Sequence, residues 1–425
     1  MKSIIHSKNT FLFFFVTLFT GLSFVCNAQS KSKAESQKSI AFEKYLKTGA
    51  DQPEIYLSLL KDKKVGILTN QTGIIQYLVT SGRSKDEREQ QVFIDTESIV
   101  DYLIKNKINL KKIYAPEHGF RGTADAGELI KDGKDTKTGL PIISLYGNNK
   151  KPTKEQLAEI DVMIFDLQDV GARFYTYISS LHYLMEACAE NNIPVIVLDR
   201  PNPKGATVDG PVLEMKNKSF VGMHPIPVLH GMTIGEYAQM INGEKWLKNG
   251  VQAKLTIIPV KNYNKGMHYS LPVKPSPNLP NDTSINLYTS LCFFEGTNVS
   301  MGRGTEKQFQ IYGSPFLKNM DFTFTPKPNE GAKDPVHNGV KCFGEDLSTH
   351  KTIDGLSLEW LLKAYKNTDN KEKFFNNFFI KLAGTDQLQK QIEKGLTEKE
   401  IRSTWKAGIE EFKETRKKYL LYTDF

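Results

Sequence analysis

The chain has few cysteines, which limits the kinds of site it can build. Four occur among 425 residues, and Cys26 lies in the N-terminal segment. The other three, Cys188, Cys292 and Cys342, are widely spaced and odd in number, which argues against a disulfide scaffold and favours buried thiols. No cysteine and histidine spacing typical of a structural metal site occurs. We therefore expect neither a disulfide framework nor a bound metal.

Glycine-rich phosphate loops are also missing. The turn after the first apolar run reads TNQTGI, without the G-x-G-x-x-G pattern of dinucleotide-binding folds or the Walker pattern. We therefore expect no nucleotide and no other cofactor. The net charge of +8 comes from basic residues scattered along the chain, which is compatible with anionic partners such as acidic sugars but gives no sign of a nucleic-acid partner.

Only one long apolar run occurs, at residues 11–25, and it follows two lysines. Because Cys26 and Ala28 occupy small-residue cleavage positions, residues 1–28 are predicted to be a secretory signal peptide, with a run too short for a transmembrane anchor. Lipidation of Cys26 is the alternative, disfavoured by the bulky pair before it. The mature chain should be periplasmic or secreted, off the membrane, with a flexible leader at residues 29–45.

The length and the apolar pattern predict the fold class. A mature chain of about 400 residues exceeds a single core, so we expect two domains, at residues 46–248 and 249–425. Between residues 63 and 200, apolar runs such as KVGILTN, KKIYAPE, DVMIFDLQD and PVIVLDRPN alternate with amphipathic stretches. This βα alternation predicts an α/β protein: a Rossmann-like N-terminal domain with a parallel sheet, followed by a smaller mixed α+β C-terminal domain.

Helix signals support this reading of the N-terminal domain. Thr153 with Gln156, and Thr233 with Glu236, form capping-box patterns. One apolar stripe at helical spacing consists of Phe174, Ile178, Leu181, Met185 and Cys188. Residues 81–91 are polar and predict an exposed loop.

Polar residues follow the ends of the predicted strands. They are Asn70 and Gln71, Glu117 and His118, Asp166 and Asp169, and Asp199 and Arg200. In an open parallel sheet, ligands bind outside the carboxyl ends of the strands, so these residues predict a binding edge. Asp199 also fits a turn or a helix cap, and Asp166 and Asp169 also fit the entry of a helix that Arg173 shares.

Glu117 is the strongest candidate for a catalytic acid. Its neighbours Tyr114, Pro116 and Phe120 should partly desolvate the carboxyl group, which could then keep its proton near neutrality as a general acid must. His118 could orient Glu117 or hold substrate, or could instead be a supporting or capping imidazole. A metal site is a weaker alternative, with ligands from His118, Asp166, Asp169 and His182.

The C-terminal half contains a second carboxylate in a similar setting. Glu295 follows the apolar run LCFF, and Arg303 stands between two glycines that would let the backbone approach a ligand closely. Glu295 could be a base, a nucleophile or an acceptor for sugar hydroxyls. A simple salt bridge between Glu295 and an arginine is the structural alternative.

Many motifs in fixed order carry a family resemblance. They are NQTG, APEHGFRG, GLPIISLYG, FDLQDVGARFYTY, VLDRPNP, VDGP, HGMTIGEYA, SPNLPN, FEGTNVSMGRGT and GSPF. From about residue 55 to the YLLY near the C-terminus, the chain resembles the exo-acting β-N-acetylmuramidases of glycoside hydrolase family 171, formerly described only as a domain of unknown function. The loop after NQTG departs from the family in its length and in the charges at residues 83–89.

The resemblance implies release of N-acetylmuramic acid (MurNAc) from the non-reducing ends of peptidoglycan fragments such as MurNAc-GlcNAc, without a metal or nucleotide. It makes the glutamate of EHG, Glu117, the catalytic acid. Asp169 and Glu295 are the leading second carboxylates, and a separation from Glu117 of roughly 5 Å would indicate retention, whereas roughly 6.5 to 9.5 Å would indicate inversion. The sequence does not fix the oligomeric state.

Muramic acid carries a lactyl carboxylate, which a guanidinium can bind with two parallel hydrogen bonds. Arg121, Arg173 and Arg303 lie in candidate site loops, and Tyr175 and Tyr177 could stack on a sugar. The complete predicted set is Glu117, His118, Asp169 and Glu295 for catalysis, and Asn70, Gln71, Arg121, Asp166, Arg173, Tyr175 and Arg303 for substrate binding. Two rival hypotheses remain: a non-catalytic muropeptide-binding protein, and a metal-dependent esterase or deacetylase of cell-wall sugars.

Overall fold

The structure is a computed structural model that describes residues 45–80, 92–120 and 132–424. The expected signal peptide, nearly all of the expected leader, the predicted loop at residues 81–91 and the candidate Arg121 lie outside the described residues. From Lys47 onward the chain forms one compact unit. Among the residues described, no helix has both the length and the apolar character needed to cross a bilayer.

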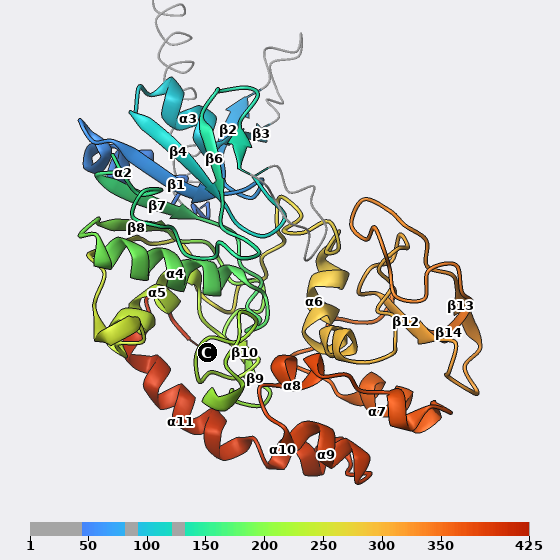
Figure 1. The fold of residues 1–425 in the computed structure, drawn as a ribbon. Coiled ribbons are helices and arrows are strands. Elements are labelled where there is room, and N and C mark those ends of the chain that lie inside the picture. Colours follow the sequence, from blue (N-terminus) through green and yellow to red (C-terminus); the bar gives the residue numbers. More distant parts are fainter. Residues whose placement is uncertain (1–44, 81–91, 121–131, 425) are drawn as a thin grey trace, which may run out of the picture. The chain divides into compact units, whose positions relative to one another are not determined.

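A seven-stranded sheet in the order β11-β8-β7-β1-β4-β6-β5 organises the first half (Figure 1). All neighbouring strands are parallel except the β5–β6 pair. The strands are β1 (Val65–Thr69), β4 (Leu110–Ala115), β5 (Gly133–Lys134), β6 (Pro141–Ser144), β7 (Val162–Asp166), β8 (Val195–Leu198) and β11 (Leu255–Ile258). The parallel sheet expected from the continuous apolar runs is therefore confirmed.

Both faces of this sheet are covered, because successive side chains of a strand point to opposite sides. In β7, Ile164 packs in a cluster with α2 and α3, whereas Phe165 packs in a larger cluster with α4 and α5. The helices are α2 (Pro53–Leu60), α3 (Ile99–Lys105), α4 (Tyr177–Glu190) and α5 (Ile234–Gly243). Two ribbons accompany them: β2 (Ile74–Thr80) with β3 (Val92–Ser98), and β9 (Val208–Asp209) with β10 (Leu229–His230). The arrangement is the α/β fold that the sequence predicted.

The second half of the chain has a smaller sheet than the first and combines strands with helices, as predicted. A three-stranded antiparallel sheet has the order β12-β14-β13, and helices pack beside it (Figure 1). The strands are β12 (Ile311–Ser314), β13 (Phe322–Phe324) and β14 (Cys342–Asp346). The α-helices are α6 (Asp282–Leu291), α7 (Glu359–Asn367), α8 (Phe378–Ala383), α9 (Gln387–Glu393), α10 (Glu398–Ser403) and α11 (Lys406–Arg416). Short 3₁₀ helices lie at η1 (Met215–Asn217), η2 (Lys248–Gly250), η3 (Cys292–Gly296), η4 (Lys371–Lys373) and η5 (Lys417–Tyr419).

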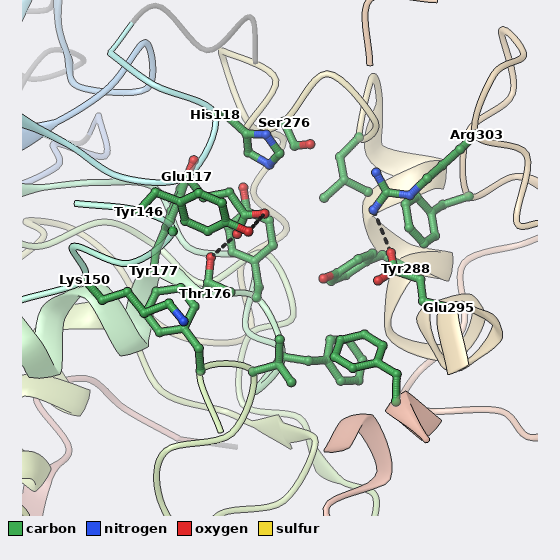
Figure 2. Close-up of a pocket in the computed structure, with 18 residues that line it drawn as sticks. Glu117, His118, Tyr146, Lys150, Thr176, Tyr177, Ser276, Tyr288, Glu295 and Arg303 are labelled. Atoms are coloured by element: carbon green, nitrogen blue, oxygen red, sulfur yellow. Dashed lines mark hydrogen bonds and ion pairs between the residues drawn. The ribbon is translucent and has the colours of Figure 1, made fainter. Parts of the chain in front are cut away.

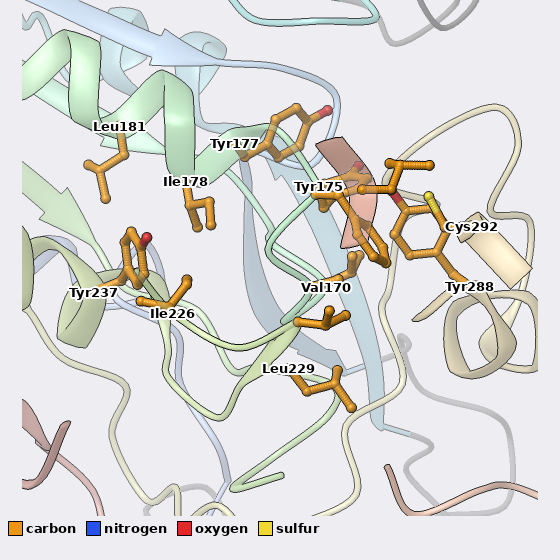
Figure 3. Close-up of a cluster of buried hydrophobic side chains, with 14 of the residues drawn as sticks. Val170, Tyr175, Tyr177, Ile178, Leu181, Ile226, Leu229, Tyr237, Tyr288 and Cys292 are labelled. Carbon is orange, nitrogen blue, oxygen red and sulfur yellow. The ribbon is translucent and has the colours of Figure 1, made fainter. Parts of the chain in front are cut away.

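One apolar core joins the two halves. The larger cluster contains Ile178 and Leu181 of α4, Tyr237 of α5 and Tyr288 of α6, and Figure 3 shows part of it. The edge strand β11 lies after residue 248, where the sequence suggested a domain boundary, yet pairs with β8 of the large sheet. The boundary itself stays a prediction.

Two local helix predictions have different outcomes. The Thr233–Glu236 capping box forms at the start of α5, with the Thr233 side chain accepting from the Glu236 backbone. At Thr153 the capping hydrogen bonds also form. The Thr153 backbone donates to the Gln156 side chain at 2.9 Å, and the Gln156 backbone donates to the Thr153 hydroxyl at 3.2 Å. Residues 154–159, however, form turns that do not continue into an α-helix.

Candidate active site

A pocket of about 440 Å³ opens where loops of the large sheet meet the segment that follows α6 (Figure 2). Both halves of the chain contribute to its lining. The first half supplies Glu117, His118, Tyr146, Gly147, Lys150, Phe174, Tyr175, Thr176, Tyr177, Phe220, Val221, Ser276 and Leu279, and the second half supplies Tyr288, Glu295, Arg303, Phe309 and Phe378. Many of these residues are aromatic and a few are charged, which is the usual lining of a small-molecule site.

Glu117 is held at the end of β4 by two hydroxyl groups. The Tyr146 hydroxyl donates to Oε1 at 3.0 Å, and the Thr176 hydroxyl donates to Oε2 at 2.7 Å. Tyr146 follows β6, and Thr176 is the N-cap residue directly before α4. Three chain segments far apart in sequence therefore meet at this carboxyl group, as Figure 2 shows.

Two pocket residues have backbone conformations that bulky side chains seldom adopt. His118 has a φ of +70° and Phe309 has a φ of +52°. Both are almost fully buried. Left-handed backbone at non-glycine residues costs free energy, so the surrounding structure must hold these two residues in place; nine other described non-glycine residues outside the pocket share this conformation.

Glu295 and Arg303 lie on the opposite wall from Glu117 (Figure 2). Arg303 Nη2 donates to Glu295 Oε1 at 2.6 Å, and the guanidinium also packs over the Phe309 ring at 5.2 Å from the centroid. Burial opposes the charge of Arg303, but Glu295 outweighs it and raises the pKa of the guanidinium. The predicted salt bridge is thus present within a pocket wall, so the structural and functional interpretations of Glu295 are compatible.

Tyr175 and Tyr177 line the pocket, but their hydroxyls form hydrogen bonds within the protein. Tyr175 donates to the Pro275 carbonyl at 2.9 Å, and Tyr177 donates to the same oxygen at 3.3 Å. Asn70 donates to the Tyr177 hydroxyl at 2.6 Å, and Gln71 donates to the Lys274 and Pro275 carbonyls. Asn70 and Gln71 do not line the pocket; Gln71 holds the 274–275 segment, and Asn70 holds Tyr177 of the pocket wall.

Asp166 and Asp169 lie behind the pocket and do not line it. Asp166 is fully buried and accepts two hydrogen bonds from Arg200, at 2.6 Å and 3.0 Å. Asp169 accepts from the Gly171 backbone at 2.7 Å, which is a turn-forming contact. Their predicted parts in binding and catalysis find no geometric support here, because an acid at a strand end can equally close a turn or neutralise a buried cation.

Asp199 fits the structural alternative that the sequence allowed. Its carboxylate accepts from the Gly235 backbone at 2.7 Å and from the Thr233 hydroxyl at 2.8 Å, at the start of α5. Burial raises the pKa of Asp199 to about 6.

Arg173 is fully buried outside the pocket. Its guanidinium donates to four backbone carbonyls, those of Pro211, Ile226, Leu382 and Ala383, at 2.7 to 2.9 Å. Burial lowers the pKa of this guanidinium. The sequence correctly marked a polar segment, but the side chain points away from the site, so we remove Arg173 from the substrate-binding set.

The ligands of the weaker metal hypothesis are not brought together. Asp166 pairs with Arg200, and His182 bonds to His224 at 2.9 Å. Among the described residues, no group of three or more histidine, cysteine or acidic side chains is placed to hold a metal ion.

Sequence reasoning missed several pocket residues, most importantly Tyr146, Lys150 and Thr176. Tyr146 and Lys150 follow β6, so the strand-end rule that selected Glu117 could have found them. Thr176 stands between two tyrosines already considered. Phe220, Ser276, Tyr288 and Phe378 had no comparable signal, because they reach the pocket only through the tertiary fold.

Comparisons with known proteins agree with this geometry. The family model described as exo-beta-N-acetylmuramidase NamZ, N-terminal, matches residues 65–283, and the corresponding C-terminal model matches residues 286–422. The chain is 36% identical over 423 residues to the peptidoglycan beta-N-acetylmuramidase NamZ of Bacillus subtilis (strain 168), covering 92% of this chain and 95% of that protein.

Two solved structures of DUF1343 family proteins from Bacteroides fragilis NCTC 9343 are similar. One has a TM-score of 0.79 at 43% identity, covering 90% of this chain and 100% of the other. The second has a TM-score of 0.70 at 28% identity, covering 89% and 99%. The sequence and fold matches extend over nearly the whole described chain, and they include both walls of the pocket. The chain therefore belongs to the NamZ family of exo-β-N-acetylmuramidases and, as a member of it, is a glycosidase.

Proposed function

We propose that this glycosidase releases MurNAc from the non-reducing end of peptidoglycan fragments such as the disaccharide MurNAc-GlcNAc. The observation that carries the proposal is the pair of carboxyl groups, Glu117 and Glu295, on opposite walls of one pocket. Most glycosidases act through two such groups flanking the scissile bond. The pocket volume of about 440 Å³ falls within the range of about 300–1,000 Å³ typical of small-ligand sites, which suits a terminal sugar.

Glu117 acts as the general acid in this proposal and gives its proton to the glycosidic oxygen. Tyr146 and Thr176 fix the position of the carboxyl group. A hydroxyl can either donate or accept a hydrogen bond, so these partners can hold Glu117 both before and after it gives up its proton. His118, beside Glu117 in the pocket, either orients the acid or contacts the sugar.

Glu295 is the second carboxylate in this proposal. Its carboxylate, held by Arg303, would stabilise the positive charge that develops at the anomeric carbon of the sugar. It lines the pocket whereas Asp169 does not, which supports Glu295 over the other candidate that the sequence left open. The substrate-binding set becomes Tyr175 and Arg303 with the lining residues that the fold adds.

Export is a separate part of the proposal. The apolar run at residues 11–25, with its preceding lysines and small cleavage residues, supports secretion to the periplasm or beyond. Mass spectrometry of the protein recovered from its native host should give an N-terminus at Gln29, directly after the predicted cleavage site. A diacylglyceryl-modified Cys26 would favour the lipoprotein alternative.

Product analysis tests the function directly. Purified protein incubated with MurNAc-GlcNAc should release free MurNAc, detected by mass spectrometry, and activity should persist in excess chelator. Tight binding without release would support the muropeptide-binding alternative. Release of acetate or another ester product that stops on chelation would support the esterase alternative.

A further inference from the structure

Lys150 lies on the Glu117 side of the pocket, with Tyr146 and Thr176 (Figure 2). It belongs to the segment after β6 that also supplies Tyr146. Its ammonium nitrogen lies 4.7 Å from the centroid of the Phe220 ring, another lining residue. An aromatic face attracts a cation, so this contact holds the Lys150 ammonium group at the pocket wall.

The neighbouring cations are already paired with carboxylates. Arg303, across the pocket, is bonded to Glu295 at 2.6 Å. Lys151, the next residue in sequence, bonds to Glu186 and to Glu190, at 2.7 Å each. Within the part of the chain that the structure describes, Lys150 has no such carboxylate partner. Its position therefore combines a positive charge, partial burial and an opening to the pocket.

A carboxylate ligand would complete this arrangement. MurNAc differs from N-acetylglucosamine (GlcNAc) by the lactyl ether on C3, which ends in a carboxylate. C3 is two ring bonds from the anomeric carbon, whose glycosidic oxygen Glu117 protonates in the proposed mechanism. A group that binds the lactyl carboxylate should therefore lie on the same side of the pocket as Glu117, as Lys150 does and Arg303 does not.

We propose that Lys150 binds the lactyl carboxylate of the terminal sugar and thereby selects MurNAc over GlcNAc. The inference rests on the proposed function, since it assumes that MurNAc is the sugar beside Glu117. Lys150 takes the role of lactyl ligand for which the sequence suggested Arg173, a residue that does not line the pocket. A hydrogen bond between an ammonium and a carboxylate is stronger than one between neutral groups. The Phe220 ring beside the ammonium group also limits its contact with competing water.

Kinetics on two matched substrates test the assignment. The first is a chromogenic MurNAc glycoside, and the second is the same glycoside with its lactyl carboxyl group converted to a primary amide. Lys150→Met should lower kcat/KM on the acid by about 10- to 100-fold, chiefly through KM, and leave the rate on the amide unchanged. Lys150→Arg should keep the preference for the acid.

Lys154→Met is the matched control, because Lys154 is exposed in the same segment and does not line the pocket. It should behave as wild type on both substrates. Equal losses on acid and amide in Lys150→Met, or no loss on the acid, would overturn the assignment.

A binding measurement distinguishes failure of the proposed function from failure of the Lys150 assignment. If wild type cleaves neither glycoside, calorimetry should be used to compare its affinities for free MurNAc and for the lactyl amide of MurNAc. Tighter binding of the acid that disappears in Lys150→Met would support the role of Lys150 in a non-catalytic site. Equal binding of the two sugars by wild type would refute it.

Discussion

At the residue scale, the two pocket carboxyl groups differ in the partners that hold them. Glu117 is bonded to the hydroxyls of Tyr146 and Thr176, whereas Glu295 is ion-paired with Arg303. Groups placed in different environments can take different roles in acid and base chemistry. The surroundings of each group can therefore be tested separately.

Thr176→Val should lower kcat by about tenfold or more, because it removes a hydrogen bond worth roughly 1.5–3 kcal/mol to the carboxyl group of Glu117. Thr176→Ser restores the hydroxyl and should restore most of the rate. Steady-state kinetics on a MurNAc glycoside check this. A rate in Thr176→Val equal to that of Thr176→Ser would show that the hydroxyl does not position Glu117.

Glu295→Gln should lower kcat by at least about tenfold, since the amide cannot supply the negative charge that the proposed mechanism needs. The thermal midpoint should change little, because the glutamine keeps a carbonyl oxygen that can still accept from the Arg303 guanidinium. A large fall in the midpoint with unchanged kcat would instead make the pair structural.

The sequence predicted Glu117 and His118 beside a ligand site, but it could not decide where Arg173 points. Glu117 follows a strand whose end lies at the binding edge, so its position depends on a regular feature of parallel sheets. Arg173 lies in an irregular turn, and only the tertiary fold places four carbonyls around it. The direction of a loop side chain is not encoded by its neighbours in sequence.

At the element scale, the site depends on the loops that follow β4, β6 and β7. The pocket lies at the edge of the sheet that the rule for open α/β sheets predicted. After β1 and β8, Asn70 holds a turn, Asp199 holds the start of α5, and Arg200 pairs with Asp166. A polar strand end therefore predicts the edge at which a site lies but not which loops line it.

Helices α4 and α5 are linked by a buried histidine pair that should make stability depend on pH. His182 and His224 bond at 2.9 Å, and His224 also bonds to Tyr237 at 2.7 Å. Burial lowers the pKa of His182 to about 4, against the opposing effect of Glu186, and lowers that of His224 well below its usual value. Both imidazoles are therefore neutral in the folded protein at pH 7.

Acid should destabilise the protein through this pair. Above pH 6.5 the histidines are neutral in both states, but below it the unfolded chain binds protons that the folded chain does not. Stability should fall from pH 6.5 toward pH 4, by at most about 1.4 kcal/mol per pH unit for each histidine. Urea midpoints at several pH values should show a shallower slope in His182→Gln. His268→Gln, at an exposed position, should keep the wild-type slope; equal slopes in both variants would contradict the prediction.

At the scale of the whole molecule, the pocket requires both halves of the chain in one arrangement. The larger core cluster extends from α4 to the C-terminal helices, and Arg173 joins backbone carbonyls of residues 211 and 226 to those of residues 382 and 383. The fold class was predictable because apolar periodicity is local. The packing of the two halves against each other was not predictable, since it depends on contacts between residues about 200 positions apart.

Arg173→Met should destabilise the protein by on the order of 3 kcal/mol or more, because four buried carbonyls lose the guanidinium, although that of Ile226 still accepts from the Leu213 backbone. The thermal midpoint measures this loss. Lys413→Met, which removes an exposed pair with Glu410, should change the midpoint little. If Arg173→Met instead raised KM at an unchanged midpoint, the arginine would be a substrate ligand after all.

The most direct test of the central claim is the rate of Glu117→Gln on two MurNAc glycosides, one with a nitrophenol leaving group and one with GlcNAc. A general acid matters most for a leaving group that must be protonated. We predict a fall in kcat of about 10²- to 10⁴-fold for MurNAc-GlcNAc, a much smaller fall for the nitrophenyl glycoside, and unchanged binding of MurNAc. A near-native rate on MurNAc-GlcNAc would contradict the assignment of Glu117.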